Sequence, residues 1–168
     1  MTAGAPDSEP APQIARTLLV SRTWRPDEVD LFMYSAVTWL THRIHFDQRY
    51  ARSEGYDGVL VHGPLQGSYL GQMLFDYADP RGGSLTGISY RHHRPVYCND
   101  TLTCLAHAVA AETGPDGCVL RVELEIRDGR GTPATSGTAT LDLPGGWDPA
   151  EAPANPPRPA VVESPEAG

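Results

Sequence analysis

Two short segments of the chain hold histidines that could carry acid–base chemistry. The first reads THRIHFD and contains His42 and His45, and the second reads VHGPL and contains His62 and Gly63. An imidazole can donate or accept a proton near neutral pH, so we predict that His45 is a catalytic acid–base residue and that His42 assists it. A solvated or structural role is the alternative for a histidine in a loop.

The sequence argues against a metal site and against chemistry on a lysine. Two histidines three residues apart could bind a metal ion from one face of a helical turn, but no cysteine or carboxylate follows at the spacing of a zinc site. The sequence therefore predicts no metal site and no cofactor. Lysine is absent from the chain, which excludes Schiff-base chemistry on a lysine.

The VHGPL segment is typical of the start of a helix, with Gly63 as the cap and Pro64 at the first helical position. The first backbone N–H groups of a helix have no partner within it and carry positive dipole character. Because Gly63 lets a ligand atom come close, we predict that its N–H stabilises a developing oxyanion and that His62 binds substrate beside it. An ordinary helix start is the alternative.

A third candidate lies at the end of a later strand, where the sequence reads RHHRP. Guanidinium groups match phosphate oxygens well, so Arg91 and Arg94 are expected to hold a phosphate-bearing substrate. A solvated strand end is the alternative for both arginines.

Hydrophobic patterning predicts the elements that must position these residues. A strand is expected over residues 14–23, then a helix from Pro26 whose core face is formed by Val29, Phe32, Met33, Ala36 and Val37. A loop with one helical turn at 47–53 leads to a long helix over 63–77, and strands follow at 84–94, 101–113, 118–128 and 132–143. The later strands alternate apolar and polar residues, as in an antiparallel sheet covered on one side. The sequence thus predicts an α+β fold.

The long helix carries a continuous apolar face, formed by Leu65, Tyr69, Leu70, Met73, Leu74 and Tyr77. Gly67 and Gly71 add a strip without side chains, which would let a sheet approach the helix backbone closely. We therefore predict that this helix is buried and that the sheet wraps around it.

The composition limits the classes of partner and the cellular compartment that we expect. The formal net charge is −8, and an acidic chain with scattered arginines argues against nucleic acid or an anionic membrane as the main partner. Cys98, Cys104 and Cys118 form no CxxC pair, so we expect them to be reduced in a cytoplasmic protein. No leader with a basic region and an apolar run is recognisable, and no apolar run is long enough to span a bilayer.

Both ends of the chain differ in composition from its middle. Residues 1–13 and 145–168 are rich in proline, alanine and glutamate and lack a hydrophobic period. We predict that both are disordered tails around a single domain over residues 14–144.

The first histidine segment resembles the motif of the MaoC-like, R-specific enoyl-CoA hydratases, which have the hotdog fold. The residues that fit that motif are Tyr34, Val37, Thr38, Ile44, His45 and Ala51. HRIH followed by VHGPL is similar to one branch, the mesaconyl-CoA (3-methylfumaryl-CoA) hydratases and mitochondrial-type 3-hydroxyacyl-thioester dehydratases. The RPVY turn and the DTL after it are similar as well, so the resemblance spans about residues 31–143.

The resemblance implies a single hotdog domain and a lyase that interconverts a 2-enoyl thioester and a 3-hydroxyacyl thioester, of CoA or of an acyl carrier. His45 would handle the water and the α-proton, and the Gly63 N–H would stabilise the enolate-like thioester oxygen. The pantetheine arm would enter between subunits. Members of this branch often carry two hotdog repeats in one chain, so we expect a homodimer or a complex with another hotdog chain.

Leu40 departs from the motif, because it occupies the position where the family has an aspartate. The resemblance implies that this position lies beside the substrate. Leucine cannot transfer a proton, and losing a positioned acid–base group typically costs about 10²- to 10⁴-fold in rate. Asp47, His42 or a carboxylate of a partner chain could substitute for the missing group. Two alternatives stay open: a catalytically degenerate hotdog subunit beside an active partner, and a hotdog acyl-CoA thioesterase, for which the long helix offers no persuasive nucleophile.

Overall fold

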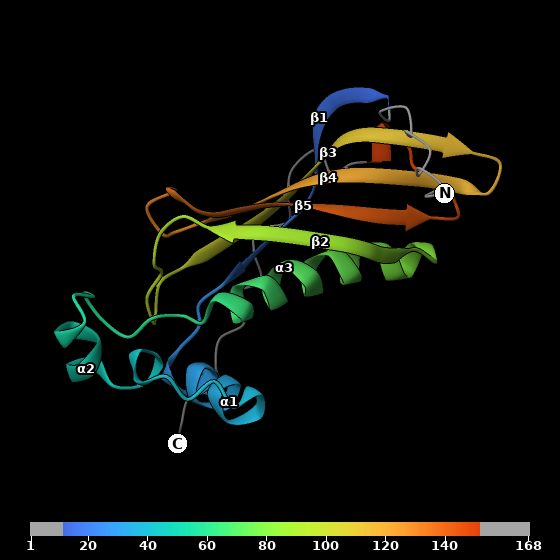
Figure 1. Cartoon of the computed structure of the whole chain (residues 1–168). Helices are drawn as coiled ribbons and strands as arrows, with labels where there is room; N and C mark the ends of the chain where they lie inside the picture. The colour runs from blue at the N-terminus through green and yellow to red at the C-terminus, as the bar shows by residue number, and fades with distance from the viewer. Residues whose placement is uncertain (1–11, 152–168) are drawn as a thin grey trace, which may run out of the picture.

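The computed structural model describes residues 12–151, in which a five-stranded antiparallel sheet lies against one long helix, α3 (Figure 1). The sheet has the strand order β1-β3-β4-β5-β2. The predicted α+β architecture, with a sheet around one long helix, is confirmed. In chain order the elements are β1 (Gln13–Trp24), α1 (Glu28–Thr38), η1 (Arg43–His45), α2 (Gln48–Ser53), α3 (Gly63–Ala78), η2 (Asp79–Arg81), β2 (Ser84–His92), β3 (Leu102–Gly114), β4 (Gly117–Arg127), β5 (Pro133–Leu143) and η3 (Pro149–Glu151).

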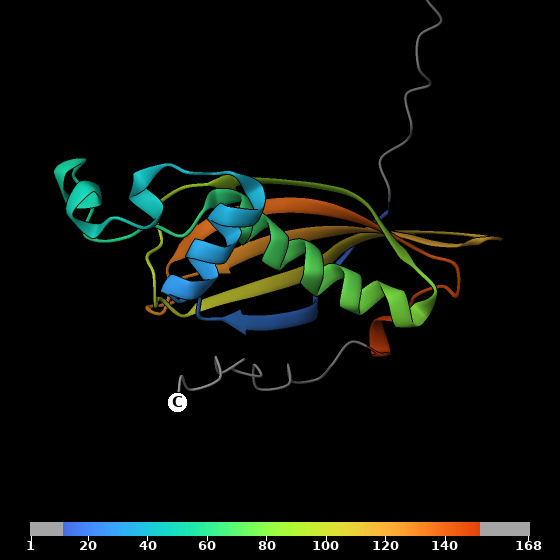
Figure 2. The same cartoon turned by 90° about the horizontal axis from the view of Figure 1, so that it is seen from below.

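Helix α3 supplies one side of the core through the apolar face that the sequence predicts. Leu70, Met73 and Leu74 are fully buried, and Leu65 and Tyr77 nearly so. The facing strands alternate, as in β4, where every second side chain is buried. Seen from below, α3 crosses one face of the sheet, while β2 runs along an edge (Figure 2).

The start of α3 lies one residue earlier than the sequence indicates. His62 is the N-cap, so Gly63 and Pro64 are the first two helical residues. The shift matters little for the proposed chemistry, because the N–H of a first helical residue has no partner within the helix.

Of the two glycines expected to admit the sheet, only one does so. A Cβ built on Gly67 would stand 2.1 Å from Oη of Tyr90, on β2, whereas one built on Gly71 would meet no atom within 4 Å. The prediction is therefore correct for Gly67 and wrong for Gly71. Strand β2 packs against the first turns of α3, so close approach is needed there.

The predicted core face of α1 is wrong. Leu31 and Ser35 are the buried residues of this helix, at 0% and 6% exposure. The five residues assigned to the core are all exposed, namely Val29, Phe32, Met33, Ala36 and Val37. Apolar residues occur on more than one side of α1, so spacing alone does not select the side that packs on the rest of the chain.

All three cysteines are free, with Cys104 and Cys118 buried and Cys98 half-buried. Trp147, in the segment predicted as a tail, packs partly buried against the core. Residues 1–11 and 152–168 of the predicted tails lie outside the described residues. Within residues 12–151, no helix is long and apolar enough to cross a membrane.

Candidate active site

A backbone hydrogen bond holds His45, at the end of η1, in a defined tautomer. Its Nδ1 lies 2.9 Å from the carbonyl oxygen of Leu60. A carbonyl can only accept, so Nδ1 donates and Nε2 presents a lone pair. Partial burial lowers the pKa of His45 below its usual value, outweighing the effect of the Leu60 hydrogen bond, and His42 lowers it further. Neutral His45 is thus a base oriented by the backbone.

His62 packs directly on His45, and the two rings are stacked with centroids 3.8 Å apart and planes at 19°. The His62 side chain is fully buried, and its Nε2 is 2.8 Å from Oγ of Ser35 in α1. Burial, and secondarily the nearby His45, lowers the pKa of His62 to about 4. A neutral ring therefore supports His45 at physiological pH. The ring is too buried in this conformation to touch a substrate, in contrast to the predicted role of His62.

Gly63 follows His62 and begins α3, which brings the predicted oxyanion donor next to the stacked histidines. The N–H of a first helical residue is available to a ligand and lies at the positive end of the helix dipole. The structure therefore brings His45 and Gly63, 18 positions apart in the sequence, to one helix start.

His42 and Asp47 lie close to His45, but both have other interactions. The exposed His42 ring meets His45 edge-on at 6.4 Å, and its Nδ1 accepts weakly from the N–H of Ile44 at 3.5 Å. Asp47 caps α2 by accepting from the N–H of Tyr50, and it pairs with Arg43 at 2.5 Å. These bonds, that of Arg43 first, hold the pKa of Asp47 below its usual value. An ionised carboxylate anchored in this way is a poor proton donor.

A hollow of about 370 Å³ opens beside His45. Three apolar side chains, one carboxylate, one amide and the His45 imidazole line it: Glu28, Phe32, His45, Phe46, Gln48 and Val59. Leu40 is 39% exposed just beyond the end of α1 and is not part of this lining. The hollow therefore leaves space for a small ligand beside His45.

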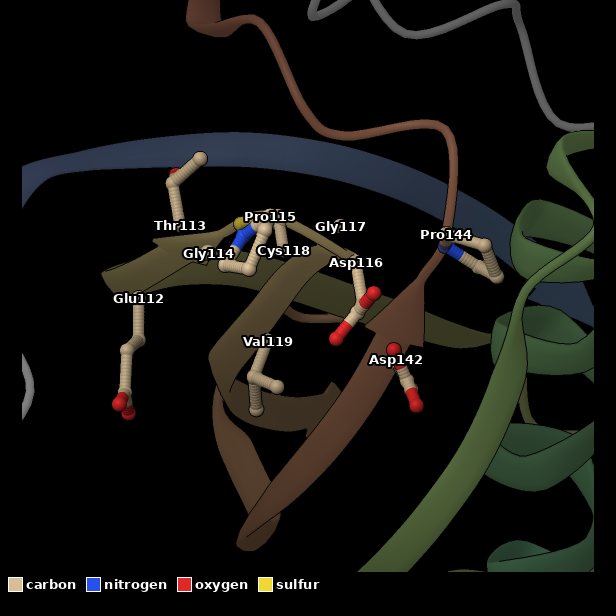
Figure 3. Close-up of a pocket in the computed structure, with 10 residues that line it drawn as sticks. All are labelled: Glu112, Thr113, Gly114, Pro115, Asp116, Gly117, Cys118, Val119, Asp142 and Pro144. Carbon is tan, nitrogen blue, oxygen red and sulfur yellow. The ribbon is translucent and has the colours of Figure 1, made fainter.

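The predicted phosphate-binding arginines are exposed, and the structure does not place them against His45. Arg94 lines a separate polar hollow of about 530 Å³, together with Arg130, Asp57 and Asp128. A further hollow of about 360 Å³ lies at the β3–β4 turn (Figure 3) and contains none of the predicted site residues. Within the described part of the chain, no three His, Cys, Asp or Glu side chains are grouped to hold a metal ion.

Two contributors to this region escape sequence reasoning. Ser35 is an unremarkable helix residue in the sequence, yet it bonds the buried ring of His62. His92 ends β2, and its imidazole packs over Gly63. Both contacts connect segments more than 25 positions apart, and no local sequence pattern signals them.

Comparison with known proteins identifies the family. Residues 2–98, more than half of the chain, match the model of the family described as hydroxyacyl-thioester dehydratase type 2. The chain belongs to this family. It is also 33% identical over 145 residues to the mesaconyl-C(4)-CoA hydratase of Chloroflexus aurantiacus, a match that covers 84% of this chain and 47% of that protein. The chain thus spans about half the length of this curated relative. The resemblance inferred from the two histidine segments is confirmed.

Solved structures support the same fold. An (R)-hydratase from A. caviae involved in PHA biosynthesis superposes with a TM-score of 0.68 at 20% identity, covering 83% of this chain and all of that one. A chain of the ChsH1–ChsH2 complex from Mycobacterium tuberculosis gives a TM-score of 0.64 at 19% identity, covering 77% of this chain and 98% of that one. At such identities the likeness concerns the fold, and the predicted hotdog fold is confirmed.

Proposed function

We propose that this chain is a lyase that interconverts a 2-enoyl thioester and a 3-hydroxyacyl thioester, with the thiol carried by CoA or an acyl carrier. The observation that carries the proposal is the state of His45. Its Nδ1 is held by the Leu60 carbonyl, its Nε2 is available as a base, and its ring is packed next to the start of α3. Membership of the dehydratase family supports the same reaction.

In the hydration direction, Nε2 of His45 takes a proton from water as the water oxygen bonds to C3 of the enoyl thioester. The C2=C3 electron pair shifts onto the thioester oxygen, which accepts a hydrogen bond from the Gly63 N–H. A proton is then delivered to C2 and the carbonyl re-forms. The His62 ring, neutral because it is buried, supports His45 without adding a second charge.

Phosphate contacts form the second part of the proposal. Arg91 and Arg94 are exposed, and a guanidinium matches phosphate oxygens well, so they can hold the phosphates of a CoA or of a carrier's pantetheine arm. Arg94 lines a different hollow from His45, so we infer that an extended substrate links the two.

The partner is proposed to be a second hotdog chain, identical or different. The exposed apolar side chains of α1 and the segment after it favour a covered surface, since Phe32, Val37 and Trp39 are 62%, 75% and 84% exposed. One chain of similar fold was solved as part of the ChsH1–ChsH2 complex. We place the protein in the cytoplasm, because its three cysteines are all unpaired.

A catalytically degenerate subunit is the second candidate, and Leu40 is the observation that favours it. This residue provides no proton-transfer group where the related motif has an acid, and the nearby Asp47 is committed to Arg43. In this case the chain would contribute cavity walls to a competent partner.

The test follows the absorbance of the conjugated thioester when the purified full chain meets a panel of 2-enoyl-CoAs. We expect turnover by the wild type and its loss in His45→Ala. If the wild type is inactive while Leu40→Asp or addition of a partner hotdog chain restores turnover, the chain is a degenerate subunit. Release of free thiol instead of hydration would identify a thioesterase.

A further inference from the structure

A second imidazole covers the first turn of α3. His92 ends β2, and its Nε2 lies 2.9 Å from the point where a Cβ on Gly63 would stand. A side chain at position 63 would have to displace this ring. His92 Nε2 therefore lies against the residue whose N–H is proposed to hold the thioester oxygen.

A buried hydrogen-bond chain fixes which nitrogen of His92 carries the proton. The hydroxyl of Thr135 donates to Oε1 of Gln66 at 2.9 Å, so its oxygen accepts from Nδ1 of His92 at 2.8 Å. Thr135 is fully buried and Gln66 is 3% exposed, so both partners are held in the packed interior. Nδ1 thus bears hydrogen, and Nε2 of His92 presents a lone pair.

His45 is held in the same tautomer at the same helix start. Its Nδ1 donates to Leu60, and its ring stacks on His62, the residue directly before Gly63. Two imidazoles, each with a bare Nε2, therefore contact consecutive residues where α3 begins. One of them is the base proposed above, and Leu40 leaves the second proton-transfer role unfilled.

We propose that His92 is the second catalytic residue of this site and that its Nε2 exchanges the proton at C2 of the thioester. The inference rests on the proposed function, and it assigns to His92 the role that an acid at position 40 has in the related motif. His45 then acts on the oxygen at C3.

In the dehydration direction, each proton that moves has a donor and an acceptor. Nε2 of His92 takes the proton from C2, and the C–H electron pair forms an enolate whose oxygen is bound by the Gly63 N–H. The C3–O bond breaks as the hydroxyl takes a proton from the His45 imidazolium and leaves as water, and C2=C3 forms. Solvent then removes the proton from His92 and returns one to His45. Hydration is the reverse.

The surroundings of His92 suit this role. The residue is exposed, so its imidazole is open to solvent. Partial burial of the ring, and then the neighbouring His93, lowers the pKa of His92 below its usual value, which favours the neutral form that takes a proton. The Tyr90 ring packs beside it at 5.5 Å between centroids and limits its movement.

The experiment compares His92→Gln and His92→Ala with the wild type and with His93→Gln. His93 is the adjacent histidine, and its Nε2 is 2.7 Å from the exposed Oγ of Ser136, so the control makes the same chemical change next to the site. Two rates are measured on the full chain with a 2-enoyl-CoA: hydration, and exchange of the C2 proton of the 3-hydroxyacyl-CoA with deuterium from D₂O. Circular dichroism of each variant verifies folding.

We expect both His92 variants to lose about 10²- to 10⁴-fold in kcat and in C2 exchange with a nearly unchanged KM, and His93→Gln to match the wild type. A His92→Gln enzyme with wild-type kcat and exchange, while His45→Ala is inactive, overturns the role of His92 and leaves the proposed function standing. Absence of turnover by the wild type across the panel overturns both. If His92→Ala fails to fold, His92→Gln still gives the decisive comparison, because the position is exposed and glutamine is polar.

Discussion

Replacing Ser35 with alanine should destabilise the protein far more than a serine-to-alanine change normally does. The Ser35 hydroxyl is the hydrogen-bond partner of Nε2 in the fully buried His62, and Nδ1 of that ring has no partner among the described residues. Ser35→Ala therefore leaves both ring nitrogens unsatisfied in the interior. Stranding a buried polar group costs about 1–3 kcal/mol. For a domain of this size that lowers Tm by about 4–12 °C.

The matched control is Ser68→Ala, on the exposed side of α3. Its hydroxyl donates to the Pro64 carbonyl at 3.0 Å, and alanine has the higher helix propensity, so we expect a change within about 0.5 kcal/mol. Thermal and urea unfolding of the two variants give the comparison. Equal stabilities for Ser35→Ala and Ser68→Ala would refute the assignment of a hydrogen-bonded, buried His62. Weaker hydration by Ser35→Ala is also expected, because His62 supports His45.

Three further changes test the packing and the protonation states. Gly67→Ala should cost about 1–3 kcal/mol in unfolding free energy, because its Cβ would overlap Tyr90. Gly71→Ala, where a Cβ meets no atom, should stabilise the protein by about 0.5–1 kcal/mol. Equal effects of the two changes in urea unfolding would contradict this. His62 has a pKa of about 4 when folded and 6.5 when exposed, so the unfolded chain gains the proton first as pH falls. The wild type should lose up to about 3 kcal/mol between pH 6.5 and 4 from this group, and His62→Gln should show a shallower pH dependence of stability. Burial lowers the pKa of His45, so the pH profile of kcat/KM for hydration should show the apparent pKa of this base below 6.5. An apparent pKa above 7 would count against His45 as the base.

The sequence predicts the elements of the sheet and α3 well because their patterns are local. The spacing of Leu70, Met73 and Leu74 is typical of a helix with one buried face, and the alternation of β4 matches a sheet covered on one side. Pro64 and the glycine before it mark the helix start to within one residue. The motif resemblance adds the order of the elements and the fold.

The orientation of α1 and most of the site geometry depend on contacts between distant segments. Apolar residues on several sides of α1 leave its packed face undetermined until Ser35 meets His62. His92 reaches Gly63 only because β2 pairs with β5 in a register that sets it opposite Thr135. No spacing within either segment encodes these pairings, so the sequence places His45 and Gly63 at the site but misses Ser35 and His92.

Transfer of oxygen from ¹⁸O-labelled water tests the role of His45 most directly. We would incubate the wild type and His45→Gln with a 2-enoyl-CoA in labelled water and measure the mass of the product by mass spectrometry. The glutamine amide can still donate to the Leu60 carbonyl. We expect the wild type to place one ¹⁸O on C3 of an intact 3-hydroxyacyl-CoA and His45→Gln to do so about 10²- to 10⁴-fold more slowly. Equal labelling rates, or label found only in a free acid after loss of the thiol, would contradict hydration by His45 at the start of α3.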